Sequence, residues 1–212
     1  MRRLPIYLLL DTSGSMHGEA IEAVTNGLQV MISSLRQDPY ALETAWVSVI
    51  TFNSNATQVV PLTELTAFQP PVLTATGTTE MGAALKFLAE RISAEVSKGS
   101  TEVKGDWKPI IFAMTDGHAT DDLQPGIDAI KQIKSGSIVA CAAGPSADTN
   151  QLKRITEAVV QLDTADANSI RAFFKWVSSS ISVSSQKVEQ GGKEVGGLSD
   201  LPPPPPEVNV VM

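Results

Sequence analysis

Residues 4–15 read LPIYLLLDTSGS, an apolar run that ends in an aspartate, several hydroxyl side chains and a glycine. The apolar part is short and continuous, which is typical of a strand that is buried on both faces of a parallel sheet. Asp11, Ser13 and Ser15 follow it, and Gly14 permits a turn that a larger residue would resist. The stretch therefore predicts a central strand with a carboxylate and two hydroxyls at its end.

Along the rest of the chain, strand-like apolar runs alternate with stretches whose apolar residues recur every three or four positions, as on one face of a helix. Further strands are expected at residues 45–52, 58–62, 109–114, 137–142 and 159–162, and helices at residues 21–35, 81–96, 123–133, 149–155 and 170–181. The first two of these strands have the turn-forming sequence NSN between them and are expected to form a hairpin. We therefore predict an α/β protein of the three-layer α-β-α, Rossmann-like class, with a mostly parallel central sheet of about six strands and one antiparallel edge strand.

The composition limits the classes of partner. The 212-residue chain carries 16 Lys and Arg against 23 Asp and Glu, a formal net charge of −7. Such a surface does not attract nucleic-acid phosphates or acidic lipids, so we expect neither nucleic acid nor a membrane as partner. The chain has one cysteine, Cys141, so an intrachain disulfide is excluded. Cys141 lies in an apolar run, which fits a buried thiol in a reducing compartment. Because no apolar run approaches the roughly 20 residues of a membrane span and no signal-peptide pattern is visible, we expect a cytoplasmic protein.

The alternating pattern stops near residue 185, where the sequence continues with two Gly pairs and five consecutive prolines. Such a composition cannot bury a core, and the prolines favour an extended polyproline II rod. We therefore predict a folded domain over residues 1–184 and a flexible tail over residues 185–212. The last five residues, VNVVM, are apolar, and they either form a frayed end or dock as an added strand on the domain or on a partner.

Polar side chains are expected to meet at one edge of this sheet, because ligands of open α/β sheets bind beyond the carboxyl ends of the strands, where the strand order reverses. Three segments reach that edge: DTSGS at residues 11–15, TGTT at residues 76–79 before a predicted helix, and TDG at residues 115–117. Their donors are all oxygens, from two carboxylates and several hydroxyls, which suits a hard cation such as Mg²⁺, and no Cys/His set is present for zinc. DTSGS alone would equally fit a turn that caps a helix.

Together, the patterns D-T-S-G-S, T-G-T-T and T-D-G resemble the metal-ion-dependent adhesion site (MIDAS) of von Willebrand factor A (VWA) domains, and the resemblance extends over about residues 1–182. It implies a shell for Mg²⁺, or for Mn²⁺ or Ca²⁺, formed by Asp11, Ser13, Ser15, Thr79 and Asp116. Thr79 is preferred to Thr78 because the family motif, similar to GGTxxxxAL, places its threonine at that distance from the following Ala-Leu pair. In such domains the hydroxyls tend to bind the metal directly, whereas the aspartates often act through water.

The resemblance implies a binding module rather than an enzyme, in which a partner supplies an Asp or Glu carboxylate that completes the coordination of the metal. An aspartate after the first strand also fits a Mg²⁺-dependent phosphatase of the haloacid dehalogenase type. Those enzymes resemble DxDx[TV], however, and Ser13 stands where their second aspartate acts as a general acid. Because the sequence also has no G-x-S-x-G, Walker or G-x-G-x-x-G motif, we expect no catalytic residues. Residues beside the motifs either tune the choice of partner or serve as surface and capping residues: Met16, His17, His118, Asp121 and Asp122.

Within the VWA family, the opening RRLPIYLLLDTSGSM and the segment TGTTEMGAAL resemble the TerY-like proteins of bacterial tellurium-resistance and stress-response clusters. This resemblance implies a metal-dependent scaffold that acts beside a protein phosphatase and a kinase. An alternative is a VWA subunit that assists an AAA+ ATPase in cofactor insertion, since the chain has no ATPase motif of its own.

Overall fold

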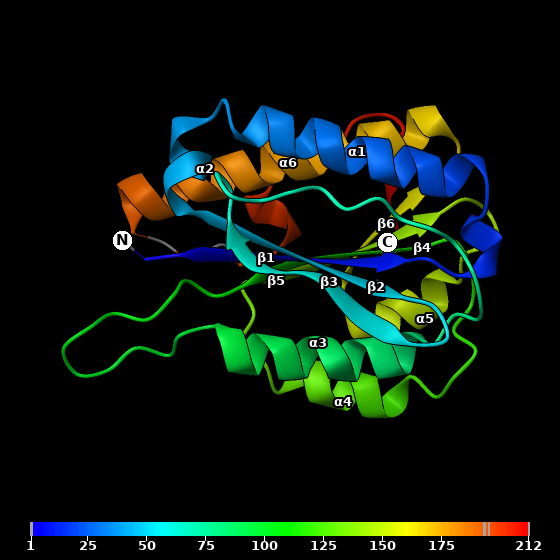
Figure 1. Ribbon diagram of the computed structural model, residues 1–212, viewed down its shortest axis with the longest axis horizontal. Coiled ribbons are helices and arrows are strands. Elements are labelled where there is room, and N and C mark those ends of the chain that lie inside the picture. The colour runs from blue at the N-terminus through cyan, green and yellow to red at the C-terminus, as the bar shows by residue number, and fades with distance from the viewer. Residues whose placement is uncertain (1, 193, 195, 212) are drawn as a thin grey trace.

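The computed structural model describes residues 2–192, 194 and 196–211, and within them one mixed sheet lies between two layers of helices (Figure 1). The strands are β1 (Leu4–Asp11), β2 (Ala45–Phe52), β3 (Ala56–Glu64), β4 (Ile110–Thr115), β5 (Ser137–Ala143), β6 (Ala158–Leu162) and β7 (Val208–Val210). The helices are α1 (Glu19–Leu35), α2 (Pro39–Thr44), α3 (Met81–Glu95), α4 (Gln124–Lys131), α5 (Thr149–Ile155) and α6 (Ala167–Gly191), with 3₁₀ turns η1 (Gly14–Met16) and η2 (Leu198–Asp200). Helices α1, α2 and α6 cover one face of the sheet, and α3, α4 and α5 cover the other (Figure 1). No helix in the described ranges is both long and apolar enough to cross a membrane.

The strand order is β3-β2-β1-β4-β5-β6-β7, with β1 between β2 and β4. The inner strands run parallel, whereas β3 pairs antiparallel with β2 at one edge and β7 pairs antiparallel with β6 at the other. The order reverses beside β1, because the chain moves outward from β1 to β2 and β3 before it returns to β4. The predicted three-layer α/β class is confirmed. The sheet has two antiparallel edge strands, β3 and β7, whereas the sequence predicts one.

Strand β1 is an inner strand of the sheet, and all eight of its residues are buried. Leu8 and Leu10 pack into the core that the sheet forms with α1 and α6. Tyr7 and Leu9, which alternate with them, pack into the core formed with α3 and α4. Burial of one such leucine contributes about 1.5–3 kcal/mol relative to an exposed one. This burial on both faces explains why the run has no polar residue until Asp11, where the strand ends.

Helices α3 and α4 approach each other closely through two glycines, Gly82 and Gly126. A Cβ atom on Gly126 would collide with the backbone oxygen of Gly82, and one on Gly82 would collide with the backbone oxygen of Asp122. Because no side chain fits at either position without a shift of the backbone, this contact fixes where α3 begins. The segment TGTT lies directly before that point.

The C-terminal region differs from the flexible tail that the sequence predicts for residues 185–212. Helix α6 runs through the predicted domain boundary at residue 184 and ends at Gly191. Its buried face is rich in serine in this part, with Ser180 and Ser184 fully buried. The sequence therefore lacks the apolar periodicity that marks a helix there.

The C-terminal strap (residues 196–211) packs on the domain and ends in the edge strand β7. Leu201 is buried in the core shared with α1 and α6. The indole Nε1 of Trp176 donates a hydrogen bond to the carbonyl oxygen of Pro202 at 2.8 Å. Of the alternatives for the final apolar residues, the structure shows an added strand on the domain itself, while Met212 lies outside the described residues.

We expect Gly126→Ala to lower the free energy of unfolding by about 1–3 kcal/mol, because the new methyl group collides with the backbone of α3. Gly191→Ala is the matched control, since a Cβ there meets no atom within 4 Å and alanine favours a helix over glycine by about 0.5–1 kcal/mol. Urea denaturation followed by circular dichroism measures both variants. Equal unfolding free energies would contradict the close contact of the two helices.

Leu201→Ala is expected to lower the free energy of unfolding by about 2–4 kcal/mol, since it removes a buried side chain that joins the strap to the domain. Pro203→Ala, at an exposed position of the same strap, is expected to change it by less than about 1 kcal/mol. Thermal and urea denaturation measure the unfolding free energies of Leu201→Ala and Pro203→Ala. If both variants unfold alike, the strap does not pack on the domain in solution.

Candidate metal centre

The three polar segments meet at the carboxyl ends of β1 and β4, where the strand order reverses. Backbone hydrogen bonds join them: the amide of Gly14 donates to the carbonyl of Gly77 at 3.0 Å, and the amide of Thr120 donates to the carbonyl of Thr79 at 2.8 Å. The amide of Thr79 in turn donates to the hydroxyl oxygen of Thr120 at 3.2 Å. Residues 76–79 are thus held between the end of β1 and the residues that follow β4.

The hydroxyls and carboxylates of the first and third segments form one connected cluster. The hydroxyl oxygens of Ser13 and Ser15 lie 3.0 Å apart, and that of Ser15 donates to Oδ1 of Asp116 at 2.6 Å. Asp11 accepts the backbone amide of Ser13 at Oδ1 (2.7 Å) and the hydroxyl of Thr115 at Oδ2 (2.5 Å). The cluster therefore holds four of the predicted ligands and spans β1 and β4.

The hydroxyl of Thr79 lies close to Gly117, as the hydroxyl of Ser15 does. A Cβ atom on Gly117 would lie 3.8 Å from the hydroxyl oxygen of Ser15 and 3.9 Å from that of Thr79, so both hydroxyls face the same point. Thr79 is buried, whereas Thr78 is exposed and its hydroxyl oxygen lies 2.9 Å from that of Ser54. The structure brings Thr79 to the cluster and leaves Thr78 outside it.

Both aspartates of the cluster are buried: Asp11 is 1% exposed and Asp116 is 8% exposed. In the described part of the chain, no Lys or Arg forms an ion pair with either carboxylate. Burial raises the pKa of Asp11 above its ordinary value, hydrogen bonds from Ser13 and Thr115 lower it, and the nearby charge of Asp116 raises it further. The cluster therefore carries negative charge that its surroundings do not compensate.

A divalent cation fits this arrangement. The two carboxylates balance its charge, and the donor atoms are all oxygens, which Mg²⁺, Mn²⁺ and Ca²⁺ favour as ligands. Within the described residues, no group of three or more Cys, His, Asp or Glu side chains could hold a metal ion. A metal at this site would therefore depend on the hydroxyls of Ser13, Ser15 and Thr79 as well as on the two aspartates.

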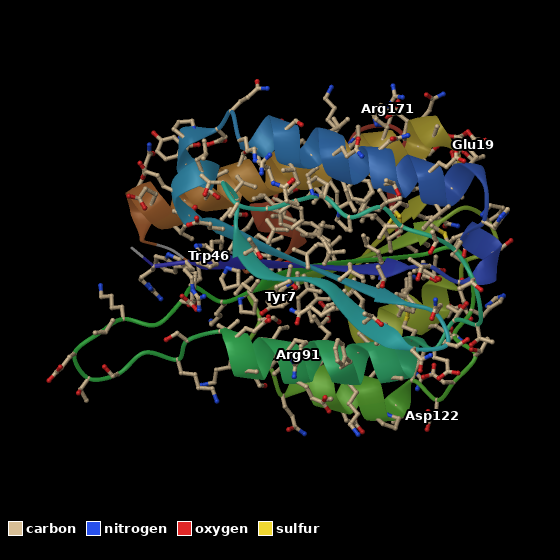
Figure 2. The ribbon with its side chains drawn as sticks, in the orientation of Figure 1. Tyr7, Glu19, Trp46, Arg91, Asp122 and Arg171 are labelled. Atoms are coloured by element: carbon tan, nitrogen blue, oxygen red, sulfur yellow. The ribbon has the colours of Figure 1, made fainter. Side chains whose placement is uncertain are left out.

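The residues around the cluster have partly structural roles. Asp121 accepts two backbone amides at the start of α3, at 3.0 and 2.8 Å, and so caps that helix. The side chain of His118 is 67% exposed, and its Nδ1 lies 3.6 Å from Oδ2 of Asp148. Glu19 and Asp122 lie at this same end of the molecule, on opposite faces of the sheet (Figure 2). This end of the molecule thus carries further carboxylates besides those of the cluster.

Two residues outside the predicted metal shell shape the cluster. Thr115, which the sequence places at the same edge in the TDG motif, donates a 2.5 Å hydrogen bond to Asp11. Thr120 holds Thr79 in place from 41 residues away in the sequence. No local pattern marks Thr120, because its partner is defined only once the chain has folded.

The fold and the cluster define an α/β domain with a candidate metal centre at the point where the strand order of its sheet reverses. A family model of the von Willebrand factor type A domain matches residues 6–176, and the chain belongs to this family. Comparison with curated protein sequences gives no match.

Solved structures share the fold at low sequence identity. A von Willebrand factor type A protein from Catenulispora acidiphila is 18% identical, with a TM-score of 0.64 over 86% of this chain and 43% of its own. The pilus adhesin SpaC from Lactobacillus rhamnosus GG is 15% identical, with a TM-score of 0.68 over 86% of this chain and 31% of its own. Proximal thread matrix protein 1 from the mussel byssus, in a structure with a zinc-occupied MIDAS motif, is 18% identical, with a TM-score of 0.60 over 84% of this chain and 48% of its own. This chain spans less than half the length of each of these proteins.

Asp116→Asn is expected to raise the melting temperature of chelator-treated protein by a few degrees, because one of two neighbouring buried carboxylates loses its charge. Mg²⁺ is expected to raise the melting temperature of the unchanged protein, since a ligand of the folded state stabilises it, and to have little effect on the variant. Differential scanning calorimetry with Mg²⁺ and with chelator measures both effects. Asp128→Asn, at an exposed position of α4, is the control. A Mg²⁺-induced shift of equal size in Asp116→Asn would contradict a metal site at the cluster.

Proposed function

We propose that this protein is a metal-dependent protein-interaction module that recognises a carboxylate of its partner. The observation that carries the proposal is the pair of buried aspartates, Asp11 and Asp116. Both accept hydrogen bonds from hydroxyls, and among the described residues neither forms an ion pair with Lys or Arg. We assign the metal shell to Asp11, Ser13, Ser15, Thr79 and Asp116.

The divalent ion, which we take to be Mg²⁺ or else Mn²⁺ or Ca²⁺, would supply positive charge and a coordination position open to an outside ligand. Ser15 is exposed, so a partner can reach the cluster from that side. The hydrogen bonds from Ser15 to Asp116 and from Thr115 to Asp11 orient the two carboxylates before any ligand arrives. A partner Asp or Glu suits the open position because charge-assisted contacts are strong where water is partly excluded.

Two proteins of the same fold support a binding role. The mussel byssus protein holds zinc in its MIDAS motif, and SpaC is a pilus adhesin. A catalytic role has less support, because Ser13 stands where a phosphatase of the haloacid dehalogenase type carries its general acid, and a serine hydroxyl cannot serve as one. We therefore propose that the protein is not an enzyme.

The resemblance of residues 2–16 and 76–85 to TerY-like proteins supports a more specific proposal. The chain would act in the bacterial cytoplasm as a scaffold in tellurium resistance and stress response, beside a protein phosphatase and a kinase. The second candidate is a VWA subunit that assists an AAA+ ATPase. In both cases the catalytic activity belongs to the partners.

Asp11→Ala is expected to abolish metal binding while leaving the fold intact, because it removes a deeply placed oxygen donor and half of the compensating charge. Isothermal titration of Mg²⁺ and Mn²⁺ into the purified protein tests this, with Asp128→Ala on the exposed face of α4 as the control. Circular dichroism spectra of all three proteins establish that they are folded. Equal heats from Asp11→Ala and the unchanged protein would remove the site from consideration.

An affinity capture from a source lysate identifies the partner. The bait is the full chain, and capture is carried out with Mg²⁺ and with chelator, for the unchanged protein, Asp11→Ala and Asp128→Ala. We expect partners that depend on both Mg²⁺ and Asp11 but are retained by Asp128→Ala. A phosphatase or kinase among them supports the TerY-like proposal, and an AAA+ ATPase supports the alternative. Partners that are indifferent to chelator and to Asp11 would contradict metal-dependent binding.

A further inference from the structure

A groove of about 970 Å³ lies at the end of the molecule opposite the metal centre. Its walls are α3 from Lys86 onward, the end of α4 with the residues that follow it, and the base of the segment 97–108, which projects from the body at the left of Figure 1. Ile92, Ile133 and Trp107 are among the apolar side chains that line it. The proposed carboxylate recognition at the metal makes no use of this groove.

The lining of the groove is positively charged, although the chain as a whole carries −7. Its charged side chains are Lys86, Lys98, Lys108, Lys134, Glu90 and Asp106. Asp106 is already paired with Arg3, whose Nη2 lies 2.6 Å from Oδ2 of the carboxylate. Among the described residues, Lys86, Lys98 and Lys134 make no ion pair, so their charge is free to act on a ligand.

One lysine of the groove already binds a carboxylate of the same chain. The Nζ atom of Lys108 lies 2.5 Å from Oε2 of Glu194, in the segment that follows α6. Arg2 adds a further positive charge beside the groove, with its guanidinium carbon 3.6 Å from the ring centroid of Trp107. Spaced cationic groups beside apolar walls fit an extended segment that carries several carboxylates and an apolar side chain.

We propose that this groove binds an acidic peptide segment of a protein partner. The carboxylates of the segment lie on Lys86, Lys98 and Lys134, and an apolar side chain packs against Ile133 and Trp107. A nucleic acid would meet the same lysines, but its phosphates would gain nothing from the apolar walls and would be repelled by the acidic remainder of the surface. The inference is independent of the metal centre.

Fluorescence anisotropy with the full chain tests the proposal, in the presence of chelator so that the metal centre does not bind the probe. The probes are two labelled peptides of equal length, each with one leucine, one otherwise built of Asp and Glu and the other of Lys. A single-stranded oligonucleotide of the same charge as the acidic peptide is the third probe. The variants are the double charge reversal Lys86→Glu/Lys134→Glu and its neutral form Lys86→Gln/Lys134→Gln.

The matched control is Arg171→Glu/Lys175→Glu, which changes the net charge equally at exposed positions of α6, on the other face of the sheet. We expect the acidic peptide to bind, the basic peptide not to bind, and the charge reversal to weaken binding by at least about tenfold while the control does not. The neutral form is expected to weaken it less, and melting curves report whether each variant is folded.

Three results would overturn the proposal. They are no binding of the acidic peptide in chelator, equal losses in the groove variants and the control, or oligonucleotide binding as tight as that of the peptide. If the acidic peptide binds only with Mg²⁺ and not to Asp11→Ala, it occupies the metal centre. That outcome rejects the groove and leaves the proposed function standing.

Discussion

The fold brings two carboxylates, of Asp11 and Asp116, together in a place with little access to water. Since β1 and β4 are adjacent and parallel, the residues that end one strand must meet those that end the other. A buried ion without a counter-charge costs several kcal/mol, and hydrogen bonds from neighbouring hydroxyls offset only part of that cost. Among the described residues, no Lys or Arg forms an ion pair with either carboxylate, so part of that cost remains. A bound cation would remove it, which is why the cluster is better explained by function than by stability.

The rest of the domain keeps the three polar segments in register. Strand β1 cannot shift without opening two hydrophobic cores, because its side chains alternate between them. Residues 76–79 form no helix or strand of their own and are held by hydrogen bonds to Gly14 and Thr120. Helix α3 starts directly after them, and the close contact between Gly82 and α4 fixes that start. The position of the Thr79 hydroxyl therefore depends on helix packing outside the cluster itself.

The sequence predicts those features whose signals are local. The apolar run of β1, the helical periodicity of α1 and α3, and the DTSGS motif each need only a few neighbouring residues to be recognised. The features that it does not predict depend on distant contacts. The serine-rich end of α6 is helical because it packs on the domain. The sequence leaves β7 open between a frayed end and an added strand, and it is a strand because β6 offers it an open edge. Thr120 joins the candidate metal centre only through a contact that spans 41 residues.

Helix α3 runs from the candidate metal centre to the groove, and this arrangement bears on how the two proposed sites would distinguish acidic partners. With 15 residues it is about 22 Å long, so ligands at its two ends would not collide. The end of the molecule with the candidate metal centre also carries Glu19, Asp121 and Asp122, whose negative charge disfavours a segment with many carboxylates. The lining of the groove has the opposite charge, so its affinity for a segment rises with each carboxylate that the segment carries. Under the two proposals, the metal would bind a ligand with an isolated carboxylate, and the lysines of the groove would bind a segment with several carboxylates.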